Sequence, residues 1–192
     1  MSISRPNRFT FLSALSATCV RQTFDRILSV VPVVLVPAAW TLAALAGHTT
    51  LVSSDALAVA LGVMTGFFAV FVAHPEMRGP VLGAWRRVIA VGLVVTAVGL
   101  IDQLSPAVTS SHLAVVAVWL AAPVYGLAAT GQALGLRRYR LFAAASFAGA
   151  ALLVVSAAPA VPFVAGLAGL VVGGAGQTLS VADAVWRQSR SA

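Results

Sequence analysis

The sequence contains no lysine and a single cysteine, Cys19. Without a lysine amine the chain cannot form a Schiff base, which excludes a retinal-type pigment. One thiol cannot form an intramolecular disulfide or build a cysteine metal cluster.

Charge is also scarce: 9% of the 192 residues are charged, and 60% are hydrophobic. A soluble domain carries about 25% charged residues. The apolar excess is rich in Ala, Val, Leu and Gly, which suit closely packed membrane helices. We therefore predict an all-α integral membrane protein.

Six apolar runs, each 17 to 22 residues long, are separated by short connections. About twenty residues are needed to cross a hydrocarbon core of roughly 30 Å as a helix. We predict six transmembrane helices, at 27–46, 56–73, 88–104, 113–134, 141–158 and 161–179. In residues 1–26, apolar side chains recur at helical spacing, which predicts an amphipathic helix lying on the membrane surface. The membrane domain then covers 27–182, and residues 183–192 form a tail.

The arginines set the predicted orientation. Residues 135–141 read GLRRYRL, and such a cluster cannot lie in hydrocarbon, where a central arginine costs roughly 2.5–3.5 kcal/mol. All twelve arginines fall in the two tails, the second-to-third loop and the fourth-to-fifth loop, and the other loops have none. This alternation predicts a cell-membrane protein with both termini in the cytoplasm.

The same distribution suggests what the basic charge contacts. Every arginine flanks an apolar run, so we interpret the net charge of +7 as a determinant of topology and as contact with anionic lipid head groups, with no nucleic acid as partner. The pattern leaves open a homo-oligomer or another membrane subunit as a protein partner.

Candidate chemistry is sparse. No predicted span has a charged residue near its centre, which argues against a proton-coupled pump. We expect no cofactor. A weak alternative is a shallow metal site at the outer surface, formed by His48, Asp55, Asp102 and His112. Another is acid–base catalysis by His74 and Glu76 at the inner end of the second span, although Pro75 between them suits a simple helix end.

Glycine pairs spaced by four residues occur at 62 and 66, at 131 and 135, and at 169 and 173. They let helix backbones approach closely, so we predict that they serve helix packing.

Prolines interrupt the first and fourth spans near mid-membrane, at Pro37 and Pro123. A proline in a helix leaves the carbonyl four residues earlier without its partner, and interrupted helices at matching positions indicate transporter sites. We therefore predict a ligand site between these spans, lined by Pro37, Trp40, Trp119, Pro123 and Tyr125. The Tyr125 hydroxyl should face the bundle and pair with a carbonyl freed by a proline.

Such a pocket would take a neutral, largely apolar ligand. The sequence therefore favours a small transporter, or a binding or accessory subunit of a membrane complex, over an enzyme. The alternative is a membrane enzyme that acts on a lipid head group at the cytoplasmic interface, with the arginines of the second-to-third loop on the phosphate.

Overall fold

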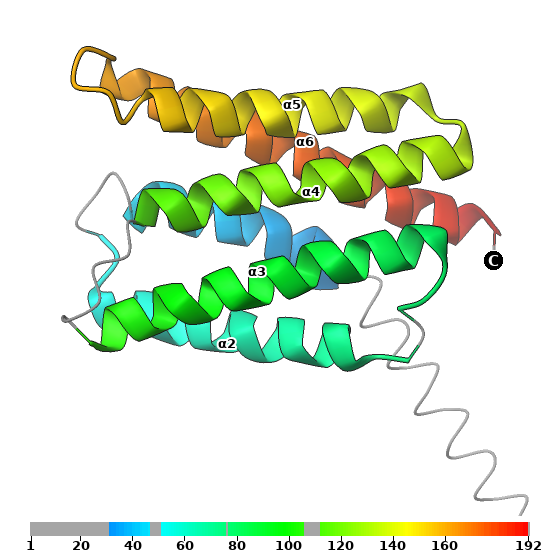
Figure 1. Ribbon diagram of the computed structural model, residues 1–192, viewed down its shortest axis with the longest axis horizontal. Helices are drawn as coiled ribbons and strands as arrows, with labels where there is room; N and C mark the ends of the chain where they lie inside the picture. Colours follow the sequence, from blue (N-terminus) through cyan, green and yellow to red (C-terminus); the bar gives the residue numbers. More distant parts are fainter. Residues whose placement is uncertain (1–30, 47–50, 76, 106–111, 192) are drawn as a thin grey trace, which may run out of the picture.

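The computed structural model describes residues 31–46, 51–75, 77–105 and 112–191, and over these ranges the chain is all-helical. A first helix covers Val31–Ala46. It is followed by α2 (Ser54–Ala73), α3 (Pro80–Leu104), α4 (His112–Leu134), α5 (Arg137–Val155) and α6 (Phe163–Ser191). Consecutive helices run antiparallel in an elongated bundle (Figure 1).

The fold class predicted from the sequence is confirmed: the protein is an all-α membrane protein. Helices α2 to α6 are each long and apolar enough to cross a membrane, and the segment Val31–Ala46 is apolar but shorter. The predicted amphipathic helix in residues 1–26 lies outside the described residues, as do His48 and Glu76.

Two helices begin earlier than hydropathy predicts, because arginine is a good helix former and its long side chain can reach the interface from within a helix. Helix α3 begins at Pro80, after Gly79 at φ 89°, so Arg86 and Arg87 are helical rather than in a loop. Helix α5 begins at Arg137.

The fourth-to-fifth loop, expected at 135–141, is therefore shorter than predicted. The turn is made by Gly135 and Leu136, and the three arginines that follow form the first turn of α5. Gly135 adopts φ 65°, a left-handed conformation that commonly ends a helix. Helix α6 also continues to Ser191, so residues 183–191, expected as a tail, are helical.

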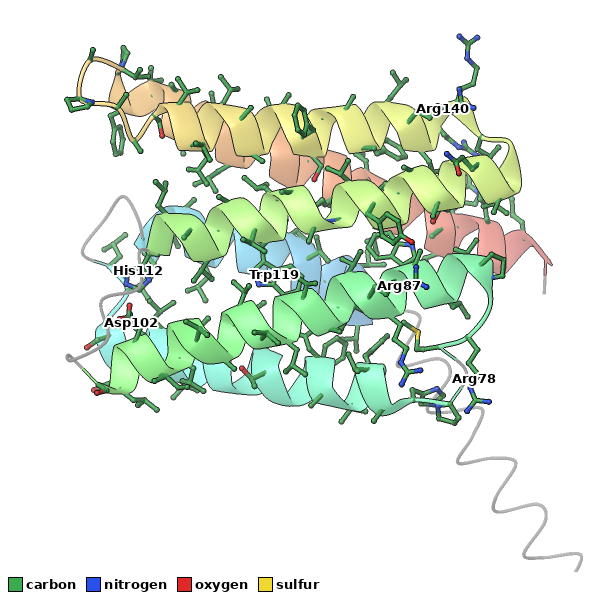
Figure 2. The ribbon with its side chains drawn as sticks, in the orientation of Figure 1. Arg78, Arg87, Asp102, His112, Trp119 and Arg140 are labelled. Carbon is green, nitrogen blue, oxygen red and sulfur yellow. The ribbon has the colours of Figure 1, made fainter. Side chains whose placement is uncertain are left out.

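The described arginines are gathered at one end of the bundle. In Figure 2, Arg78, Arg87 and Arg140 lie at one end, and Asp102 and His112 lie at the other. The remaining described arginines lie in the first turns of α3 and α5 and in the last turns of α6, at 86, 137, 138, 187 and 190. We call these the arginine end and the opposite end.

Helices α5 and α6 make the closest backbone contact. A Cβ atom added at Gly149 of α5 would lie 2.6 Å from the Gly169 carbonyl oxygen and 2.6 Å from the Gly173 Cα. The prediction that the glycine pair at 169 and 173 serves helix packing is thus confirmed. In contrast, a Cβ added at Gly62 or Gly66 of α2 would have no atom of the described residues within 4 Å.

The first helix completes the core next to α4 and α6. Trp40 and Ala44 pack against a cluster of buried side chains, namely Leu120, Ala150, Leu153 and Leu170. Trp40 also lies over Gly174 of α6, where an added Cβ would be 2.9 Å from its Cγ.

Candidate functional site

The residues predicted to line a mid-membrane ligand site are directed towards different neighbours. Trp40 contacts α6 at Gly174, as described above. The Trp119 indole N–H donates to the Thr96 hydroxyl at 2.9 Å, and its ring lies 4.7 Å from that of Phe68. The Tyr125 side chain is half exposed, and its hydroxyl accepts from Arg87 Nη1 at 2.7 Å. Trp119 and Tyr125 therefore both contact α3, and their role in ligand binding stays a prediction.

The two prolines lie in their helices as predicted, but the carbonyls that they free do not form the expected hydrogen bond with Tyr125. Pro123 is buried within α4, and it leaves the Trp119 carbonyl without a helical donor. That carbonyl accepts from the Gln177 side-chain amide of α6 at 3.0 Å. In the first helix, Pro37 frees the carbonyl of Val33, and the carbonyl of Pro37 itself accepts from the Thr41 hydroxyl at 2.9 Å. The expected pairing of Tyr125 with the freed carbonyl of α4 is therefore wrong.

Gln177 belongs to a buried polar cluster that joins three helices. Its amide nitrogen also donates to Ser146 Oγ of α5 at 2.8 Å, and Ser146 donates to the Leu120 carbonyl of α4 at 2.6 Å. Gln177 is 7% exposed and Ser146 is fully buried. Hydrogen bonds between membrane helices hold them in one register, so this cluster fixes α4, α5 and α6 against one another.

Helices α3 and α4 are joined by two matching contacts. Trp119 of α4 lies against Gly92 and donates to Thr96 of α3, so that a Cβ at Gly92 would overlap the Trp119 ring. Trp85 of α3 lies against Gly126 of α4, where a Cβ would be 2.9 Å from the Trp85 ring, and donates to Thr130 at 3.0 Å.

The two halves of this arrangement share a sequence. Residues 85–96 and 119–130 both read Trp-x6-Gly-Leu-x2-Thr. Because the helices are antiparallel, each tryptophan meets the glycine and threonine of the other copy. This repeat was not predicted, although its spacing can be read directly from the sequence.

The residues of the weak metal alternative do not assemble in the described part of the chain. No group of three or more His, Cys, Asp or Glu side chains that could hold a metal ion occurs among the described residues. At the opposite end, the His112 ring instead pairs with the Gln103 side-chain amide at 2.9 Å. Asp55 lies in the first turn of α2 and Asp102 near the end of α3.

Of the two residues in the weak catalytic alternative, only His74 lies within the described residues. His74 is the C-terminal cap of α2, and its carbonyl accepts from the Met77 backbone N–H at 3.2 Å. Glu76 lies outside the described residues, so catalysis by this pair stays a prediction.

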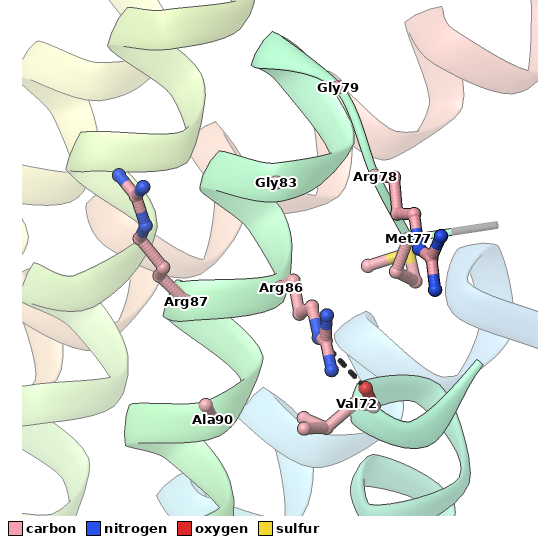
Figure 3. Close-up of a pocket in the computed structure, with 8 residues that line it drawn as sticks. All are labelled: Val72, Met77, Arg78, Gly79, Gly83, Arg86, Arg87 and Ala90. Carbon is pink, nitrogen blue, oxygen red and sulfur yellow. Dashed lines mark hydrogen bonds between the residues drawn. The ribbon is translucent and has the colours of Figure 1, made fainter. Parts of the chain in front are cut away.

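An open pocket of about 480 Å³ lies at the arginine end, and we call it the arginine pocket. It lies between the last turn of α2 and the first turns of α3 (Figure 3). Its lining residues are Val72, Met77, Arg78, Gly79, Gly83, Arg86, Arg87 and Ala90.

The arginines of this pocket are held differently. Arg86 donates its Nε–H to the Val72 carbonyl in the last turn of α2, at 2.9 Å. Figure 3 shows Arg86 and Arg78 on the same side of α3, whereas Arg87 extends to the other side, where Tyr125 of α4 accepts from it. No acidic side chain within the described residues forms an ion pair with any of the three.

Two other arginines at the same end share one acidic partner. Asp183 of α6 accepts from Arg138 of α5 at 3.1 Å and from Arg187 at 3.1 Å. In the arginine pocket, by contrast, Arg86 contacts a backbone carbonyl, Arg87 contacts a phenol, and no described carboxylate pairs with either.

Comparison of the chain with models of known protein families, with functionally characterised proteins and with experimentally solved structures finds no match.

Proposed function

We propose that this protein is a non-enzymatic membrane protein that binds the phosphate of an anionic lipid head group in the arginine pocket. In this proposal the chain spans the cell membrane six times, with the arginine end at the cytoplasmic surface. The observation that carries the proposal is the placement of Arg78 and Arg86 on one open pocket with no described acidic partner.

The level of the pocket along α3 suits a lipid head group. Helix α3 has 25 residues and is therefore about 37 Å long, against a hydrocarbon core of roughly 30 Å. Its first turns, which carry Arg86, can thus reach the head-group layer. Val72 and Ala90 line the same pocket and offer apolar contact for the start of an acyl chain.

The donors available in the pocket match phosphate. A guanidinium has five N–H groups in a planar fork that bind phosphate oxygens in pairs. Arg86 uses only its Nε–H on Val72, so both terminal nitrogens are available to a ligand. Gly79, the N-terminal cap of α3, lines the pocket, and the positive end of the helix dipole favours an anion there.

The structure gives less support to transport of a neutral ligand between the first and fourth helices. The Trp119 carbonyl freed by Pro123 already accepts from Gln177, so its missing helical donor is replaced from within the protein. The rings of Trp119 and Trp85 fill the contact between α3 and α4.

The test is lipid binding by the full-length protein, purified in an uncharged detergent. Isothermal titration calorimetry with dioctanoyl phosphatidylglycerol and dioctanoyl phosphatidylcholine compares an anionic head group with a zwitterionic one. Arg78→Gln combined with Arg86→Gln should weaken phosphatidylglycerol binding about tenfold or more, because each charge-assisted hydrogen bond contributes about 1.5–3 kcal/mol before solvent screening.

The matched control is Arg137→Gln combined with Arg140→Gln, which removes the same charge from exposed positions at the same end. It should leave binding within about twofold of the original protein if screening confines the effect to nearby charges. Equal losses in the two double variants would reduce the effect to general surface charge and contradict the proposal.

A further inference from the structure

We infer that the arginine pocket selects a phosphomonoester head group, carried by a lipid, over phosphodiester head groups. The inference rests on the proposed function and narrows it to one chemical class of ligand.

The first observation is the excess of positive charge. Arg78 and Arg86 bring two positive charges to one side of the pocket, whereas Arg87 extends to the other side of α3, and none of the described lining residues is acidic. A phosphomonoester carries about −1.5 to −2 charges at pH 7 and has three terminal oxygens as acceptors. A phosphodiester carries one charge and has two such oxygens. The pocket thus has more charge and more donors than a diester can use.

The second observation is how many donors remain. Arg86 keeps its two terminal nitrogens, because only Nε is bound to Val72. Arg78 has no hydrogen bond or ion pair to another residue in the described part of the chain, so its whole guanidinium is available. Two planar forks from one side of α3 can bind the three oxygens of a terminal phosphate, with one oxygen shared (Figure 3).

The third observation is what the pocket lacks. Besides the arginines, its lining residues are Val72, Met77, Gly79, Gly83 and Ala90. None of these has a carboxylate or an aromatic ring, the groups that recognise ammonium and quaternary ammonium head groups. None has a hydroxyl or amide side chain to bind a sugar or glycerol head group. Among the described lining residues, the arginines alone offer polar side chains, and these suit the phosphate.

A lipid is favoured over free phosphate as the source. The methylene and thioether groups of Met77 and the side chains of Val72 and Ala90 adjoin the arginines in the same pocket. Free phosphate gains nothing from these apolar groups, whereas the first carbons of an acyl chain can be buried against them.

The experiment compares dioctanoyl phosphatidic acid with dioctanoyl phosphatidylmethanol, which differs by one methyl group and loses the second ionisation. Both are titrated calorimetrically into the full-length protein in uncharged detergent at pH 7.5 and fixed ionic strength, beside inorganic phosphate and dioctanoyl phosphatidylglycerol. We expect phosphatidic acid to bind about tenfold more tightly than phosphatidylmethanol, the effect of one charge-assisted hydrogen bond. Inorganic phosphate should compete only at concentrations at least about a hundredfold higher.

Variants separate the pocket from general charge. Arg78→Gln should reduce the preference for phosphatidic acid over phosphatidylmethanol to about twofold or less, and Arg140→Gln should leave it unchanged. Arg78 is exposed and has no described side-chain contact, so its replacement should preserve folding, which circular dichroism checks.

The outcomes distinguish this inference from the proposed function. Equal affinities for phosphatidic acid and phosphatidylmethanol, with arginine-dependent binding of phosphatidylglycerol, would overturn the monoester preference and leave the proposed function standing. Competition by inorganic phosphate at the concentration of the lipid would overturn the assignment to a lipid. No arginine-dependent binding of any anionic lipid would overturn both.

Discussion

Gln177 of α6 donates its side-chain amide to the Trp119 carbonyl of α4 at 3.0 Å, at the carbonyl that Pro123 leaves without a helical donor. A neighbouring helix therefore supplies the hydrogen bond that the proline removed. An unpaired carbonyl is costly in a membrane interior, so the proline and the glutamine form one structural unit.

This relationship predicts the effect of Gln177→Leu. The substitution leaves the Trp119 carbonyl and Ser146 without a donor, and we expect the free energy of unfolding to fall by about 1–2 kcal/mol. Reversible unfolding in detergent, followed by circular dichroism, measures it. Gln132→Leu is the control, because Gln132 is an exposed residue of α4.

Pro123→Ala gives an internal check on the same unit. Alanine restores a backbone N–H to α4, so Trp119 no longer depends on Gln177. The double variant should then be more stable than the sum of the single effects predicts, by about 0.5–1.5 kcal/mol. Simple additivity of the two effects would show that Gln177 acts independently of the proline.

The two tryptophan contacts between α3 and α4 predict strong effects of very small changes. Gly92→Ala and Gly126→Ala each place a methyl group against an indole ring, and each should destabilise the protein by about 1–3 kcal/mol. Gly62→Ala adds the same methyl group to α2 where no atom lies within 4 Å, and it should be neutral or slightly stabilising. A similar loss of stability in all three variants would show that the loss comes from altered helix bending and not from the tryptophan contacts.

Tyr125→Phe removes the hydroxyl that accepts from Arg87 and leaves the ring in place. We expect a loss of about 0.5–1.5 kcal/mol in the free energy of unfolding, the net contribution of one hydrogen bond. Phe147→Tyr, at an exposed position in α5, controls for the effect of a phenol at the lipid-facing surface. An unchanged stability of Tyr125→Phe would show that Arg87 finds an equally good partner in the head-group layer.

Topology can be tested with single cysteines after Cys19→Ser. Ser53 caps the start of α2 at the opposite end, and Ser189 lies in the last turns of α6 at the arginine end. In intact cells, a membrane-impermeant maleimide should label Ser53→Cys and should label Ser189→Cys only after the cells are opened. Labelling of Ser189→Cys in intact cells would place the arginine end outside.

The helices could be predicted from the sequence because the length of an apolar run is set directly by the thickness of the membrane. The starts of α3 and α5 were misplaced because hydropathy counts arginine as polar, whereas Arg86 and Arg137 extend the helices into the interface. The pairing of Gln177 with Trp119 was not predictable, since nothing in the order of residues says which helices are neighbours. The carbonyl freed by Pro123 could be predicted, but the donor could not.

Part of the arginine pocket could also be predicted from the sequence. The arginines near the second-to-third loop could be predicted to bind phosphate from their chemistry alone. Their division into Arg78 and Arg86 on one side of α3 and Arg87 on the other depends on the early start of the helix at Pro80. Hydropathy placed all three in a loop, where no side can be assigned.

The most direct test of the arginine pocket as the lipid site is to fill it without changing its charge. A Cβ at Gly83 would have no atom of the described residues within 4 Å, so Gly83→Leu should fold and project into the pocket. Gly62→Leu adds the same side chain to α2, where the described residues also leave the space open. Calorimetric titration with dioctanoyl phosphatidic acid should show affinity reduced about tenfold or more in Gly83→Leu, the equivalent of roughly 1.4 kcal/mol, and unchanged in Gly62→Leu. Full affinity in Gly83→Leu, with all three pocket arginines still present, would contradict the assignment of lipid binding to this pocket.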